Sequence, residues 1–137
     1  MKKITLLSAI VVSVFFVSCT SDSEPTPTTN SIEGKWEYVE EGKFVDNKFE
    51  LFDYQHSAAV SADFLEIKSN GEINDMYFYN DNSVDELHGV WFKNGNNLTV
   101  SFDDEMQVAQ VKELNASTLK LEYTINGSKY IKILQRM

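Results

Sequence analysis

Along residues 32–137, apolar and polar side chains alternate, and short runs of turn-forming residues interrupt the alternation. A period of two is typical of antiparallel strands that bury one face and expose the other. Leu98, Val100 and Phe102, for example, alternate with polar neighbours. The pattern predicts strands at residues 34–40, 64–68, 72–79, 87–93, 97–102, 106–114, 119–125 and 129–135.

The segments between these strands carry the residues that tight hairpins need. Asn70-Gly71 and Asn126-Gly127 tolerate positive φ, and residues 94–96 and 103–105 are further polar turns. The apolar residues of 106–114 change phase, which indicates a bulge or a face switch. Seven or eight short strands joined in this way predict an all-β, antiparallel up-and-down barrel of about eight strands, because closure removes exposed sheet edges.

Residues 43–63 fit neither the strand nor the helix pattern cleanly. Val45, Phe49 and Phe52 have the spacing of one helical face, whereas Phe49 alternates with Leu51 as in a strand. The end of this segment is short and rich in alanine, which suits a helix. We predict one strand followed by a short helix or lid.

The N-terminal residues indicate targeting rather than folding. Two lysines precede an apolar run at residues 4–17, which is too short for a helix to cross a hydrocarbon core of about 30 Å, and this is typical of a signal peptide. Ser18-Cys19 at the end of the run resembles a lipobox, although Phe16 stands where Leu is more usual. Such a cysteine is lipidated and the signal is cleaved before it. The alternative is an ordinary signal peptide with an unrelated cysteine.

We therefore predict a lipoprotein signal peptide at residues 1–18, a lipidated Cys19 with a flexible linker at residues 19–31, and one folded domain at residues 32–137. The linker contains two prolines, many hydroxyl groups and no large apolar residue, so it has nothing to bury. The acidic residues after Cys19 resemble the surface-export signals of Bacteroidota lipoproteins, or they simply keep the linker solvated. The predicted location is the cell envelope, anchored by lipid at the outer membrane, on its periplasmic face or at the cell surface.

Charge and cysteine content exclude several classes of function. The chain has 12 basic and 21 acidic residues and a formal net charge of −9, and loss of Lys2 and Lys3 would make the processed chain more acidic still. Such a surface repels phosphate backbones, so we expect no nucleic-acid partner. A single cysteine forms no disulfide within the chain, and His56 and His88 are too few for a zinc site by themselves. We expect neither a metal nor a cofactor.

Four segments, taken in order, resemble the lipocalin-like domain of small Bacteroidota lipoproteins. They are a G-x-W opening at residues 34–36, an apolar strand with a polar-Gly turn at residues 64–71, a G-x-W hairpin at residues 89–100, and an L-x-x-S-x-L-x-L pair at residues 114–121. The resemblance implies a lipocalin-type barrel. It does not by itself imply a ligand, because one fold serves many functions.

The resemblance also implies a contact that closes one end of the barrel. In lipocalin-type barrels a basic residue late in the chain stacks over the tryptophan of the first strand. Arg136 is the only arginine in this chain and lies at the end of the last predicted strand. We therefore predict that Arg136 stacks on Trp36, where a guanidinium over an indole contributes about 0.5–2 kcal/mol. The alternative is a solvated C-terminal charge.

Aromatic residues on the central strands are the candidate ligand contacts. Tyr77, Tyr79, Trp91 and Phe102 would line an apolar pocket if the barrel were open, or fill it if it were narrow. No nucleophile elbow or phosphate loop is present, so we do not expect an enzyme. We expect an envelope-anchored module that binds a small apolar or amphipathic molecule. The alternative is a protein-interaction or inhibitor module that uses the acidic loops at residues 80–86 and 103–105.

Overall fold

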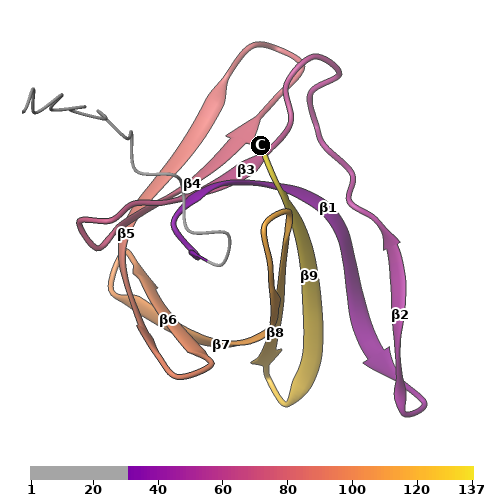
Figure 1. Ribbon diagram of the computed structural model, residues 1–137. Coiled ribbons are helices and arrows are strands. Elements are labelled where there is room, and N and C mark those ends of the chain that lie inside the picture. The colour runs from indigo at the N-terminus through magenta and orange to yellow at the C-terminus, as the bar shows by residue number, and fades with distance from the viewer. Residues whose placement is uncertain (1–30) are drawn as a thin grey trace, which may run out of the picture.

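The computed structural model describes residues 31–137, and within this range the chain forms nine strands and no helix (Figure 1). The prediction of an all-β domain is confirmed. The strands are β1 Gly34–Val45, β2 Lys48–Asp53, β3 Phe64–Ile67, β4 Glu72–Phe78, β5 Val84–Asn94, β6 Asn97–Phe102, β7 Glu105–Leu114, β8 Thr118–Ile125 and β9 Ser128–Arg136.

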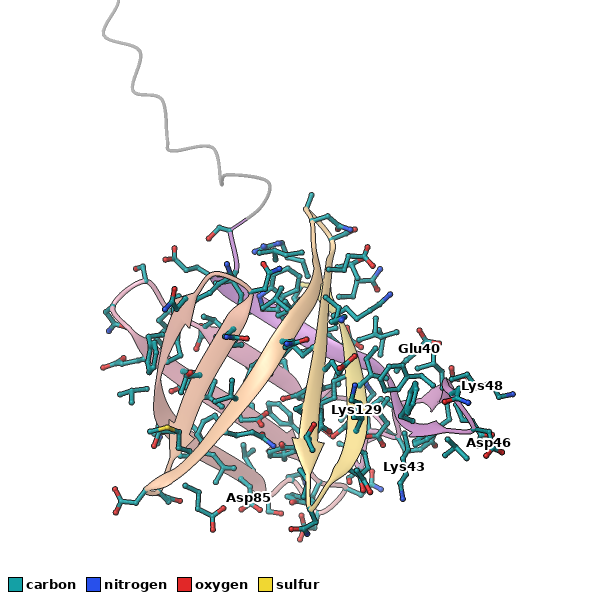
Figure 2. The ribbon with its side chains drawn as sticks, turned by 90° about the horizontal axis from the view of Figure 1, so that it is seen from below. Glu40, Lys43, Asp46, Lys48, Asp85 and Lys129 are labelled. Atoms are coloured by element: carbon teal, nitrogen blue, oxygen red, sulfur yellow. The ribbon has the colours of Figure 1, made fainter. Side chains whose placement is uncertain are left out.

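Eight of the strands form a closed antiparallel barrel, and β2 lies outside the ring (Figure 1). The ring runs β1-β3-β4-β5-β6-β7-β8-β9, and β9 returns to pair along β1. The first half of β1 pairs with β3, while its second half pairs with β2. Figure 2 shows Lys43, Asp46 and Lys48 on this β1–β2 hairpin, which projects from the side of the barrel. The predicted eight-stranded barrel is therefore confirmed, with one additional strand.

Two-residue turns with positive φ connect three of the hairpins. Both central residues have positive φ in Asp46-Asn47, Asp103-Asp104 and Asn126-Gly127. This backbone form matches the right-handed twist of the flanking strands, and Asn, Asp and Gly adopt it at the lowest cost. The predicted bulge in β7 is also present, between Val111 and Glu113.

β1 is five residues longer than the sequence predicted, since it continues to Val45 instead of ending at residue 40. A bulge between Tyr38 and Glu40 changes the phase of the strand at this point, which hides its continuation. The strand predicted within residues 43–63 is present as β2. The helical spacing of Val45, Phe49 and Phe52 was misleading, because a hairpin turn separates the first from the other two.

The predicted short helix is wrong, because residues 54–63 form an irregular segment instead. Asp63, only 2% exposed, anchors it: its carboxylate accepts hydrogen bonds from the Tyr54 hydroxyl (3.1 Å) and the Phe78 amide (2.8 Å). The Asp63 amide donates to His56 Nδ1 at 2.9 Å. These long-range bonds satisfy the polar groups of a segment that is too short to be a stable helix by itself.

One end of the barrel is solid. Six apolar side chains from six strands are almost completely inaccessible there: Trp36, Ile67, Ile73, Leu98, Leu119 and Leu134. Each lies in the inward phase of its strand, so the alternation in the sequence accounts for this layer directly.

Arg136 covers this closed end. Its Cζ lies 4.0 Å from the centroid of the Trp36 ring. Its guanidinium donates to three carbonyl oxygens, those of Ser31 (2.6 Å), Glu33 (2.8 Å) and Ala116 (2.9 Å). One side chain thus joins the start of the domain, the β7–β8 turn and β9, and it satisfies carbonyl groups that no strand pairs.

We predict that Arg136→Ala lowers the free energy of unfolding by about 2–4 kcal/mol, since it removes a cation–π contact and three charge-assisted hydrogen bonds. Urea unfolding followed by tryptophan fluorescence measures this. Lys93→Ala, at an exposed position at the end of β5, should change it by less than about 0.5 kcal/mol. Equal effects of the two substitutions would contradict the prediction.

Candidate functional site

Beyond the solid layer, the barrel interior contains a cavity of about 190 Å³. A cavity of about 150 Å³ is enough to hold benzene, so this one accommodates a small group of atoms. One side of its lining is apolar and comes from β6, β7 and β8: Leu98, Val100, Phe102, Ala109, Leu121 and Ile125. The opposite side carries Tyr38, Asp75 and Lys132 from β1, β4 and β9. The cavity therefore has an apolar wall and a polar wall.

The barrel wall opens beside this cavity, between β7 and β8. The ladder between the two strands begins at Ala109 and Tyr123, so residues 105–108 pair with β6 alone. A groove of about 760 Å³ occupies the split, and it shares four lining residues with the inner cavity: Phe102, Gln107, Tyr123 and Ile125. Further apolar groove residues include Leu87, Met106 and Val108. The inner cavity thus continues into a larger groove at the mouth.

Asp75 is the centre of the polar wall. One carboxylate oxygen accepts a hydrogen bond from the Tyr38 hydroxyl at 2.9 Å, and the other accepts from Tyr77 at 2.7 Å. Burial raises the pKa of Asp75 above its ordinary 3.8, although the two phenols and the charge of Lys132 oppose this. Burial and the nearby carboxylate also raise the pKa of both tyrosines, which therefore remain hydrogen-bond donors.

Lys132 is the basic group of the same wall. Its Nζ lies 4.6 Å from the centroid of the Tyr38 ring, a cation–π geometry. It lies one inward-facing pair above the solid layer: its partner on β8 is Leu121, and Leu119 with Leu134, two positions along the register, is the next pair on the same face. A charged side chain thus occupies an inward position between apolar ones.

The four aromatic residues singled out from the sequence lie in different surroundings. Phe102 lines both the cavity and the groove. Tyr77 contributes through its bond to Asp75, at the edge of the polar wall. Trp91 is half-buried and donates from Nε1 to the Lys68 carbonyl at 2.9 Å, while the exposed Tyr79 donates to Asp85 at 3.1 Å. The structure brings Phe102 and Tyr77 to the interior site and places the other two apart from it.

The sequence reasoning missed Asp75 and Lys132, yet a signal for them is present. Asp75 is in phase with Ile73 and Tyr77, and Lys132 is in phase with Leu134. A charged residue that interrupts an inward-facing apolar series points into the barrel. Lys132 was not recognised because the candidate ligand contacts were chosen among the aromatic residues.

The histidines have ordinary structural partners. His56 accepts the Asp63 amide, and His88 contacts Asn74 at 3.1 Å. Within residues 31–137 no three His, Cys, Asp or Glu side chains gather as a metal site. Cys19 and the linker before residue 31 lie outside the described residues, so their predicted roles are not addressed by the structure.

Solved structures share this fold at low sequence identity. A lipocalin-like protein from Bacteroides uniformis is 17% identical with a TM-score of 0.57, and the match covers 77% of this chain and 97% of that one. An uncharacterised protein from Bacteroides eggerthii is 15% identical with a TM-score of 0.56, over 78% of this chain and all of the other. At such identities the likeness concerns the fold alone. No curated protein sequence matches this chain as a relative.

The sequence itself gives the family. Residues 32–121 match the lipocalin-like domain, which is more than half of the 137-residue chain and includes β1 to β7 and the first half of β8. The matched region supplies Asp75 and most of the apolar wall, whereas Ile125, Lys132 and Arg136 lie beyond it. With this match and the closed eight-stranded barrel together, the chain belongs to the lipocalin-like domain family.

Proposed function

We propose that this protein is an envelope-anchored, non-enzymatic module that binds a small apolar or amphipathic molecule inside its barrel. The observation that carries the proposal is the continuity of the inner cavity with the groove between β7 and β8. A closed cavity would trap a ligand during folding, whereas a cavity that reaches the surface allows exchange.

The chemistry of the lining supports this proposal. Lipocalin-like folds typically bind small hydrophobic ligands, and the β6–β8 side of this interior offers them an apolar wall. The polar groups are few and fixed in position, as in sites that orient a ligand by one end. Gly89 contributes indirectly: a Cβ there would lie 2.7 Å from the Phe102 ring, so the glycine makes room for this lining residue.

The tether is the second part of the proposal. A signal peptide that ends at a lipobox-like Cys19 would place lipid on this residue, and the linker would hold the barrel away from the membrane. Within residues 31–137 there is no helical stretch with the length and hydropathy of a membrane span. Attachment through lipid on Cys19 is the anchor we propose.

We predict saturable binding of the apolar fluorophore N-phenyl-1-naphthylamine, one molecule per chain, measured by fluorescence titration. Ala109→Phe fills the inner cavity from β7 and should weaken binding at least about tenfold, because overpacking leaves no room for the ligand. Ala59→Phe adds the same side chain at an exposed position and should leave binding unchanged. Failure of the wild-type protein to bind any apolar probe would contradict the proposed function.

We predict that Cys19→Ala moves the protein from the membrane fraction to the soluble fraction of its host and abolishes metabolic labelling with an alkyne fatty acid. The thiol is the acceptor of the lipid, and the chain has no other cysteine. Thr20→Ala, the matched control next to it, should remain labelled and membrane-bound. Labelling that persists in the cysteine variant would disprove the lipid anchor.

We predict that Asp75→Asn stabilises the protein increasingly, relative to wild type, as the pH rises above 3.8. Because burial raises the pKa of Asp75 in the folded state, its contribution to stability is complete below 3.8 and is lost as the pH rises through the folded-state pKa. Urea unfolding of both proteins at several pH values between about 4 and 8 measures the difference in their free energies of unfolding.

Asp81→Asn is the control without a pH trend in this range. Hydrogen bonds from Ser83 lower the pKa of the exposed Asp81 below 3.8, so its contribution to stability is lost only at lower pH, and the difference from wild type should stay nearly constant between about pH 4 and pH 8. If the stability difference between Asp75→Asn and wild type is independent of pH, or falls as the pH rises, the pKa of Asp75 is not raised in the folded state.

A further inference from the structure

We propose that the ligand is an amphiphile with a single carboxylate, which binds with its head inside the barrel, paired to Lys132, and its apolar tail in the groove between β7 and β8. This inference rests on the proposed function and specifies the class of ligand. It specifies that the carboxylate of the ligand pairs with Lys132 Nζ and that the head of the ligand lies deeper in the barrel than its tail.

Lys132 faces the cavity and forms no direct ion pair, unlike several lysines on the outside of the barrel. Lys35, Lys112 and Lys120 each form an ion pair with a glutamate on a neighbouring strand. Within the described residues Lys132 has no direct ion pair: its Nζ lies over the Tyr38 ring, its charge acts on Asp75, and Glu41 is its register partner on β1. An ammonium group that faces a cavity without a direct ion pair can still bind an anion.

The nearby carboxylate does not take that role. Each oxygen of Asp75 already accepts a hydrogen bond from a tyrosine, from Tyr38 and from Tyr77. The same arrangement leaves little attraction for a cationic ligand, which would also meet the charge of Lys132. A group with two negative charges would be repelled by Asp75 more strongly than a monoanion. A single carboxylate therefore fits this wall best.

The two spaces determine the orientation. The inner cavity, about 190 Å³, contains the polar wall and is too small for a long chain. The groove, about 760 Å³, is larger, and Leu87, Met106 and Val108 are among its lining residues. The head therefore belongs inside and the tail outside. The mouth also has a lysine, Lys129, but Glu122 lies 3.6 Å from it and already neutralises it.

A purely structural role for Lys132 makes a different prediction. If the lysine served only to offset the charge of Asp75, its loss would lower stability and affect charged and neutral ligands equally. The comparison of two ligands with the same tail separates the two roles. Decanoate and decan-1-ol have the same number of carbons and differ in the head group.

The experiment measures the affinity of the processed chain for each compound at pH 8, by displacement of N-phenyl-1-naphthylamine. We expect Lys132→Met to weaken decanoate binding about ten- to a hundredfold, the effect of losing a charge-assisted bond. Decan-1-ol binding should change by less than about threefold. Lys132→Arg keeps the charge and should retain most of the affinity for decanoate.

Lys120→Met is the matched control, since it removes a lysine of β8 that lines neither space and pairs with Glu113 at 3.1 Å. It should leave the affinity for both compounds within about threefold of wild type. Lys129→Met tests the orientation, because Lys129 lines the groove at the mouth. A loss of decanoate affinity in Lys129→Met, with Lys132→Met unaffected, would overturn the orientation.

Other outcomes separate this inference from the proposed function. If Lys132→Met weakens both compounds equally, the lysine has a structural role and the inference fails while the proposed function stands. The same conclusion follows if wild type binds decan-1-ol and the fluorophore but not decanoate. If wild type binds no apolar compound, the proposed function itself fails. The wild-type comparison needs no variant, so the test stands even if Lys132→Met does not fold.

Discussion

The pairing of β9 with β1 is the constraint on which the rest of the structure depends. It turns a linear series of hairpins into a ring and removes the sheet edges that a flat arrangement would expose. At one end of this seam, Arg136 lies over Trp36 and bonds to carbonyls from the entry segment and from the β7–β8 turn. One residue therefore holds together parts of the chain about a hundred positions apart. Because side chains fill this end, the cavity lies toward the opposite end of the barrel.

The two walls of the interior follow from the strands that form them. β6 and β8 alternate regularly and, with Ala109 of β7, bring apolar side chains inward, whereas β4 and β9 each place one charged residue in an inward position. Desolvating Asp75 and Lys132 opposes folding, and the hydrogen bonds from two tyrosines and the cation–π contact only partly offset this. Apolar residues at both positions would fill the barrel at lower cost. The polar groups at these positions support the binding role that we propose for the interior.

Much of the fold could be predicted from the sequence, because regular alternation and Asn-Gly turns are local signals. Residues 97–102 and the turn at Asn126-Gly127 are examples in which pattern and structure agree. The failures occur where local signals conflict with distant contacts. The end of β1 was missed because a bulge shifts its phase, and its turn, Asp46-Asn47, contains no glycine. The helix was predicted from alanine content, but the buried Asp63 holds this segment to β4 through contacts that the sequence spacing does not reveal.

The site was harder to predict than the fold for a related reason. Aromatic content alone does not distinguish a lining residue such as Phe102 from one such as Trp91, which packs toward the Lys68 carbonyl. Whether a charged residue falls on the inward-facing phase of its strand is a better guide to the residues that line the interior. An inward lysine or aspartate in a barrel strand is costly, so it persists where another group compensates for it. For Asp75 these groups are within the chain, namely two phenols. For Lys132 the described residues supply an aromatic face and the charge of Asp75, but no direct ion pair, and this is the physical reason that we propose a partner for it in the ligand.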